Sequence, residues 1–136
     1  MNDDIAYVNS SIPYDPYNNT TLDQYKEYQL KKLANIRYNQ EIKGIIYNGI
    51  PISTTRDAQM SINSLALQVM SDNDYVIDYK TDNGFITLDS KMILEIAKKV
   101  REYVQSCYNR EKILSEKIKR ATNKDDIKII NWEEGD

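Results

Sequence analysis

The sequence has no histidine and a single cysteine, Cys107, among its 136 residues. Without histidine the chain lacks the commonest metal ligand and the usual general base near neutral pH. It also lacks the Ser–His and Cys–His pairs that activate most hydrolytic nucleophiles. One cysteine cannot form an intrachain disulfide, so a reducing compartment is expected. We therefore predict a non-enzymatic protein with no catalytic residues, no cofactor and no metal site.

Other features are scarce as well. The four glycines, at positions 44, 49, 84 and 135, form no Gly-rich phosphate loop. The sequence contains no run of about 18 apolar residues, which a membrane-spanning helix needs. Its opening, MNDDIAYVNSSIP, lacks the basic start and the apolar core of a signal peptide. The net charge is −3, and the lysines and arginines after Asp89 alternate with glutamates. Neither a membrane nor a nucleic acid is therefore expected as a partner.

Acidic residues gather around one turn region, at Asp72, Asp74, Asp78 and Asp82. Their spacing superficially resembles a calcium loop, but the central Gly and terminal Glu of an EF-hand are missing. Carboxylates beside turns are mostly solvated turn formers, and we interpret these in that way.

The longest periodic pattern runs from Asp89 to Thr122 and contains neither Pro nor Gly. Its apolar residues recur in steps of three and four, which predicts one stripe along a helix. They are Ile93, Ile96, Ala97, Val100, Tyr103, Val104, Cys107, Leu114 and Ile118. The stripe is interrupted at Arg110 and Glu111. We expect the half before this break to pack on the rest of the chain, and the half from about Arg110 to Arg120 to face a partner.

Shorter signals predict the remaining elements. Thr21 and Gln24 fit a capping box, and Gly44 fits a helix end. Asn48-Gly49 and the later TDNG are hairpin turns, and Thr54 or Thr55 fits a second helix cap. The expected fold is α+β and helix-dominated, with helices at about 21–43, 54–71 and 89–122 and short β-hairpins at 45–52 and 76–88. Ile127, Ile129 and Ile130 then form a last strand or an extended tail.

The first twenty residues differ in composition from the rest of the chain. They lack helical periodicity, contain Pro13 and Pro16, and are rich in tyrosine, which is a good interface anchor. We predict an extended arm at 1–20, one α+β domain at 21–132 and an acidic tail at 133–136. A frayed terminus is the alternative for the arm, and packing on the body is the alternative for Trp132. The predicted partner-binding residues are Ile5, Tyr7, Val8, Ile12, Tyr14, Tyr17 and Trp132.

A family resemblance is carried by two stretches of the sequence. The first is YNGIPISTTRDAQMSINSLA, and the second begins VIDYKTDNGFITLDSKMILEIAKKV and continues to the INW at Trp132. The order of their motifs resembles a domain family of unknown function from tailed bacteriophages and prophages, often beside or fused to tail-fibre assembly proteins. The resemblance covers roughly residues 30–132. The matching motifs are Thr54-Thr55-Arg56-Asp57, Asn83-Gly84-Phe85-Ile86-Thr87-Leu88, Cys107 and Asn131-Trp132.

The resemblance implies a function but assigns no catalytic residue. It implies a virion structural protein of the tail or tail fibre, an adaptor that docks to other phage tail or fibre proteins by its arm. Such a protein is made in the host cytoplasm, resides in the virion tail and can self-associate into a homo-oligomer. The alternative is a tail-fibre assembly chaperone that leaves the finished particle.

Overall fold

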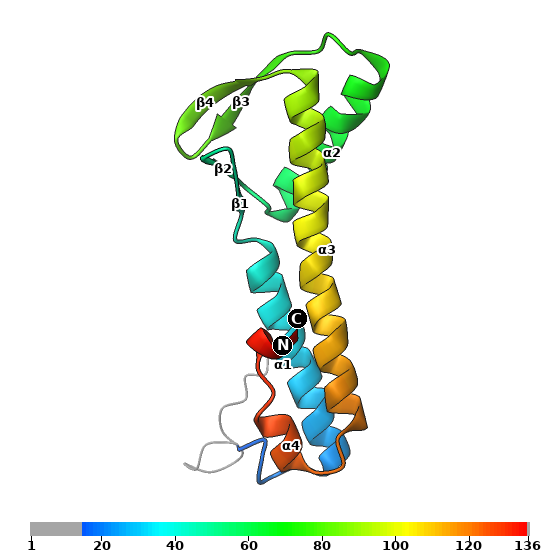
Figure 1. The fold of residues 1–136 in the computed structure, drawn as a ribbon. Helices are drawn as coiled ribbons and strands as arrows, with labels where there is room; N and C mark the ends of the chain where they lie inside the picture. Colours follow the sequence, from blue (N-terminus) through cyan, green and yellow to red (C-terminus); the bar gives the residue numbers. More distant parts are fainter. Residues whose placement is uncertain (1–14, 136) are drawn as a thin grey trace. The chain divides into compact units, whose positions relative to one another are not determined.

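The structure is a computed structural model, and it describes residues 15–135. Five of the predicted partner-binding residues, Ile5, Tyr7, Val8, Ile12 and Tyr14, lie outside the described residues. The elements follow the order α1 (Leu22–Glu41), β1 (Ile45–Tyr47), β2 (Ile50–Ile52), α2 (Arg56–Ser71), β3 (Ile77–Thr81), β4 (Gly84–Leu88), α3 (Ser90–Arg120), α4 (Lys124–Lys128) and the 3-10 turn η1 (Trp132–Gly135) (Figure 1). The predicted helix-dominated α+β class is confirmed.

Short polar side chains start the three long helices. The Thr21 amide donates to Oε1 of Gln24 at 2.9 Å, and the Gln24 amide donates back to Thr21 Oγ1 at 3.2 Å. This is the predicted capping box. Thr55 caps α2 by accepting from the Ala58 amide, and Asp89 caps α3 by accepting from the Met92 amide. Each cap satisfies an amide that has no partner inside its helix.

The two hairpins form separate two-stranded antiparallel sheets. In the first, Asn48 and Gly49 have φ values of 49° and 79°, which is the left-handed backbone that a type I′ turn requires. Pro51 pairs with Ile46 between the two flanking strand pairs, at a position whose amide does not enter the ladder. In the second hairpin, Gly84 alone takes a positive φ, of 107°, and pairs with Thr81.

The backbone divides into two compact units, which we describe separately. The middle unit comprises residues 36–110. The terminal unit comprises the residues before position 36 and after position 110. Among the described residues, every helix is too short or too polar to cross a lipid bilayer.

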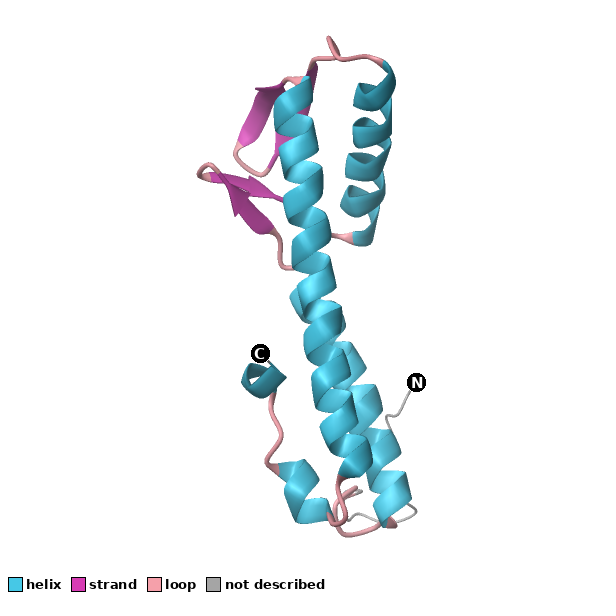
Figure 2. Cartoon of the chain, turned by 45° about the vertical axis from the view of Figure 1, so that its right-hand side comes forward, coloured by secondary structure: helices cyan, strands magenta, loops and turns pink. Residues whose placement is uncertain are grey.

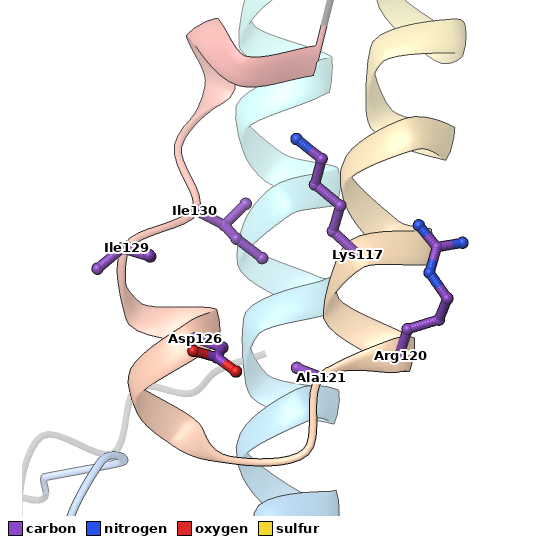
Figure 3. Close-up of a pocket in the computed structure, with 6 residues that line it drawn as sticks. All are labelled: Lys117, Arg120, Ala121, Asp126, Ile129 and Ile130. Carbon is purple, nitrogen blue, oxygen red and sulfur yellow. The ribbon is translucent and has the colours of Figure 1, made fainter.

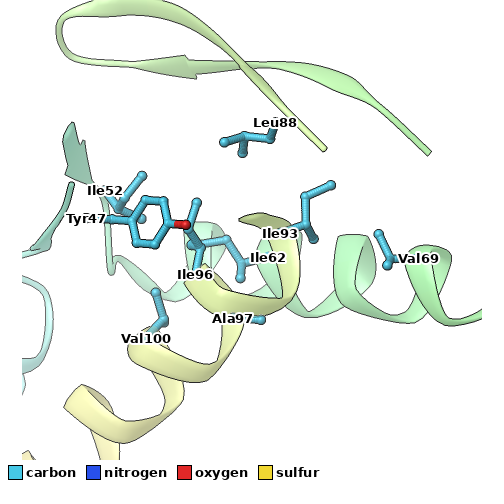
Figure 4. Packing of buried hydrophobic residues seen from close by; sticks show 9 residues of the cluster. All are labelled: Tyr47, Ile52, Ile62, Val69, Leu88, Ile93, Ile96, Ala97 and Val100. Atoms are coloured by element: carbon cyan, nitrogen blue, oxygen red, sulfur yellow. The ribbon is translucent and has the colours of Figure 1, made fainter. Parts of the chain in front are cut away.

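The core of the middle unit forms around the first half of α3. Figure 2 shows the two hairpins on one side of this helix and α2 on the other. Figure 4 shows side chains from these elements converging on it. The buried cluster consists of Tyr47, Ile52, Ile62, Val69, Leu88, Ile93, Ile96, Ala97 and Val100. The prediction that this half of the stripe packs on the rest of the chain is therefore confirmed, and its neighbours are the two hairpins and α2.

The core of the terminal unit corrects one expectation. Leu114 and Ile118, on the second half of α3, are buried together with residues of α1 and of the C-terminal segment. The buried residues of the terminal unit are Tyr25, Leu33, Leu114, Ile118, Ile127 and Trp132. The expectation that the stripe between Arg110 and Arg120 faces a partner is therefore wrong, because the chain itself covers this stripe.

A second correction concerns the segment after α3, where we expected a strand or an extended tail. Residues 124–128 form α4 instead, and Asn123 caps it by accepting from the Asp126 amide at 2.9 Å. Asp125 and Asp126 lie in the first turn, where the helix dipole favours negative charge. The cap and the two carboxylates outweigh the β-branched isoleucines, and only Ile127 of these is buried.

The burial of Leu114 makes a direct prediction about stability. Its side chain is 0% exposed, so Leu114→Ala leaves a cavity and lowers the free energy of unfolding by about 2–5 kcal/mol. Leu67→Ala is the matched control, because Leu67 is 68% exposed and its truncation changes stability by less than about 0.5 kcal/mol. Urea denaturation of the isolated full chain measures both. Equal stability of the two variants would contradict the burial of Leu114.

Candidate functional site

Residues 15–20, the last part of the predicted arm, form a turn just before α1, which we call the arm root. The Asp15 carboxylate accepts from Asn18 Nδ2 at 2.7 Å and from the Tyr17 amide at 3.0 Å. The Asn19 amide donates to the Asp15 carbonyl at 2.9 Å. The hydrogen bond from Asn18, followed by those from the two backbone amides, holds the pKa of Asp15 below its usual value despite some desolvation. The root therefore has a defined backbone conformation.

Tyr17 fastens the arm root to α1 and α4. Its ring meets the Tyr25 ring of α1 edge to face, with the centroids 5.6 Å apart. The Lys128 ammonium lies 4.6 Å from the centre of the Tyr17 ring. The Tyr17 hydroxyl donates to the Asp125 carboxylate, and this hydrogen bond raises the pKa of Tyr17. One side chain thus connects the root to two helices of the terminal unit.

Lys124 adds a second fastening point in the same unit. Its ammonium donates to the carbonyl oxygens of Tyr17 and Thr20, both in the arm root. It also lies 5.7 Å from the centre of the Tyr25 ring. Because a charged donor gives the stronger kind of hydrogen bond, Lys124 holds the root at two points.

The two predicted partner-binding residues within the described part differ in their surroundings. Tyr17 is partly exposed at the arm root. Trp132 begins η1 and is only 9% exposed, so its ring packs within the terminal unit. That packing is the alternative we considered for Trp132. Of these two residues, Tyr17 is therefore the more exposed.

A buried ionic cluster in the middle unit was missed by the sequence reasoning. The Glu41 carboxylate, 1% exposed, accepts from Arg37 Nη1 at 2.7 Å and from Arg56 Nε at 2.7 Å. Arg56 Nη2 adds a contact of 3.1 Å, and Gln59 Nε2 donates at 2.9 Å. Arg37 also lies over the Tyr108 ring, with its guanidinium carbon 4.3 Å from the ring centre. This Glu41 cluster joins the end of α1 to the start of α2.

The electrostatics of the cluster favour an ionised carboxylate. Burial raises the pKa of Glu41, but the hydrogen bonds from Arg56, Gln59 and Arg37 outweigh burial and hold it below its usual value. The neighbouring backbone is tied as well, because Thr54 Oγ1 donates to the Glu41 carbonyl at 2.6 Å and accepts from the Gly44 amide at 2.8 Å. Both carboxylate oxygens are occupied, so the cluster serves to hold the chain together.

Two partial sequence signals pointed to the cluster. Arg37 and Glu41 have the four-residue spacing of an intrahelical ion pair. Thr54 and Arg56 both belong to the motif Thr54-Thr55-Arg56-Asp57. The sequence did not indicate that this motif contacts Glu41. Arg56 and Glu41 are fifteen residues apart in different helices, and such a contact produces no repeating pattern in the sequence.

The other candidates for chemistry also have structural surroundings. Cys107 is buried, and burial raises the pKa of its thiol, as expected of a structural cysteine. Within residues 15–135, no group of three or more cysteine or acidic side chains is arranged to hold a metal ion. Asp72 accepts from the Asp74 amide, and Asp78 accepts from Thr87, so two of the turn carboxylates serve local structure.

The described residues thus define a small, helix-dominated α+β protein with a fastened arm root. A family model described as a domain of unknown function, DUF4376, matches residues 24–131. Because this match covers more than half of the chain, the chain belongs to that family. Searches of the curated proteins and of the solved structures found no match. The family description names no function, so the association with phage tails stays a prediction.

The Glu41 cluster predicts a specific pH dependence. Because the pKa of Glu41 is lowered by folding, its stabilisation is present at neutral pH and is lost as the pH falls below the ordinary value of 4.5. Glu41→Gln leaves two guanidinium groups without their counter-charge. We expect a loss of about 2–3 kcal/mol at pH 7, less than for a fully buried pair, because Arg56 is half-exposed.

Denaturation of the wild type and of Glu41→Gln between pH 7 and pH 3 tests this. The stability gap between the two proteins should shrink as the pH falls. Glu102→Gln, on the exposed face of α3, is the control and should leave stability nearly unchanged. A Glu41→Gln variant as stable as the wild type at pH 7 would show that the cluster contributes nothing.

Proposed function

We propose that this chain is a non-enzymatic structural protein of a bacteriophage virion, an adaptor in the tail or tail fibre. Its N-terminal arm binds neighbouring tail or fibre proteins, and the body provides the fixed point from which the arm extends. The sequence resemblance supports the phage setting, and the aromatic and aliphatic composition of residues 1–14 supports a binding role.

The observation that carries the proposal is the fastening of the arm root. Tyr17 and Lys124 hold residues 15–20, the last part of the predicted arm, against α1 and α4. A frayed terminus does not need contacts of this kind. A segment that binds a neighbouring protein does, because the residues that connect it to the domain must keep their position when it is bound. A root fixed by two backbone contacts and an edge-to-face ring contact is suited to that task.

Exposed apolar side chains on α2 also favour a protein-binding role. Met60, Leu67 and Met70 are 68%, 68% and 75% exposed and follow each other at steps of seven and three residues. This spacing places them on one face of the helix. Apolar side chains gathered on one exposed face are typical of surfaces that bind another protein.

A tail-fibre assembly chaperone is the alternative, and an arm serves such a protein equally well. The two functions differ in where the protein ends up. A structural adaptor is present in purified particles at a fixed copy number. A chaperone increases the yield of soluble fibre on co-expression and is absent from the particles.

Deletion of residues 1–14 tests the proposal and leaves the fastened root intact. We expect the shortened chain to keep its helical circular dichroism and its unfolding midpoint, because the described core does not include these residues. We also expect it to be missing from particles assembled in its presence, whereas the full chain is detected there by mass spectrometry. Incorporation of the shortened chain at the normal copy number would contradict a docking arm. Absence of the full chain from particles would favour the chaperone.

A further inference from the structure

The proposed function leaves two features of the described residues without a role. One is a hollow on the terminal unit, lined by Lys117, Arg120 and Asp126 together with three aliphatic side chains (Figure 3). Charges of both signs line this hollow, so it favours no single class of ligand. The other feature is chemical and lies at the two hairpin turns of the middle unit. These turns hold the only Asn-Gly pairs of the sequence, Asn48-Gly49 and Asn83-Gly84.

An asparagine that precedes glycine can lose ammonia without any enzyme. The backbone nitrogen of the glycine attacks Cγ of the asparagine side chain and gives up its proton, which leaves with the side-chain nitrogen as ammonia. Glycine favours this ring closure because it has no Cβ to obstruct the attack. Water then opens the five-membered succinimide ring at either carbonyl, which yields aspartate or isoaspartate. One water is consumed, one ammonia is released and one carboxylate is gained.

The first hairpin resists this reaction because its turn lies next to the core. Ring closure requires a rotation about the Cα–C bond of the asparagine, which a closed two-residue hairpin turn does not allow. Asn48 follows Tyr47, which is 2% exposed and belongs to the buried cluster shown in Figure 4. The Tyr47 hydroxyl also donates to the Glu95 carboxylate of α3. Opening this turn therefore disturbs a side chain that is fixed in the core.

The turn of the second hairpin lies further from buried residues. Phe85, next to Gly84, is 70% exposed, and the first buried residue of β4 is Leu88, at its far end. The Asn83 amide donates to Thr81 Oγ1 at 3.1 Å, and Thr81 Oγ1 donates to the Gly84 carbonyl at 2.8 Å. Both hydrogen bonds are exposed, so water can replace them. A turn held in this way opens locally at a small cost in free energy.

We propose that Asn83 deamidates spontaneously in the folded protein, whereas Asn48 is protected. The isoaspartate product leads the main chain through Cγ, which adds one carbon atom between positions 83 and 84. The pairing of Thr81 with Gly84 is disrupted by this extra atom. The new carboxylate also follows that of Asp82 directly in the chain. The inference is independent of the proposed function, because it depends only on the middle unit.

Prolonged incubation of the folded full chain at mildly alkaline pH tests this difference. Peptide mass spectrometry measures the conversion at each site, and enzymatic methylation identifies isoaspartate. We expect Asn83 to convert at least about tenfold faster than Asn48, because opening the first turn also disturbs one large buried side chain. In denaturant the two rates should become similar. Equal rates in the folded chain, faster conversion at Asn48, or no conversion at Asn83 while the denatured chain converts would each overturn the inference.

Matched variants connect the rate to this turn. Thr81→Val removes both hydrogen bonds of the hydroxyl, so Asn83 should convert roughly fivefold faster, the ratio that corresponds to one net hydrogen bond, and Asn48 should not change. Thr87→Val is the control, because it removes only a hydrogen bond to Asp78 further along the same hairpin. Circular dichroism of each variant before incubation checks that it is folded. An Asn83 rate that responds equally to the two substitutions would show that this turn does not control the reaction, and would overturn the inference.

Discussion

The apolar stripe of α3 is the constraint on which the rest of this structure depends. A 31-residue helix with one apolar side cannot leave that side in water, and its neighbours are short elements. In the middle unit, two hairpins and α2 cover Ile93, Ile96 and Val100. In the terminal unit, Leu114 and Ile118 are buried among residues of α1, α4 and η1. Every other element is thus positioned by the need to cover part of this helix.

Polar contacts fix what apolar burial leaves undetermined. Burial is non-directional, so it does not decide where α1 ends or how the chain enters α2. The Glu41 cluster and the Thr54 hydroxyl decide this in the middle unit, because each satisfies donors from separate segments. In the terminal unit, Lys124 and Tyr17 have the same role for the arm root. These directional contacts fix how the chain enters and leaves its helices in both units.

Sequence reasoning succeeded where the signal lies within a few residues. The Thr21 capping box, the Asn48-Gly49 turn and the cap of the second helix at Thr54 or Thr55 are local signals. The structure confirms each one and places the last cap at Thr55. The sequence reasoning failed where the deciding partner is distant in the chain. Arg110 and Glu111 interrupt the stripe locally, but whether Leu114 is covered depends on residues of α1 about ninety positions away. The carboxylate of Glu41 looked like any charged residue at a helix end until Arg56 and Gln59 were placed beside it.

Amide hydrogen exchange along α3 in the isolated full chain tests the central claim most directly. If the chain covers both halves of the stripe, amides on either side of Cys107 exchange slowly, including those around Leu114 and Ile118. Protection there must be present without any added protein. Fast exchange beyond Arg110, with slow exchange confined to the segment around Ile96, would contradict this account. It would show that the second half of the apolar stripe is not covered by the chain itself.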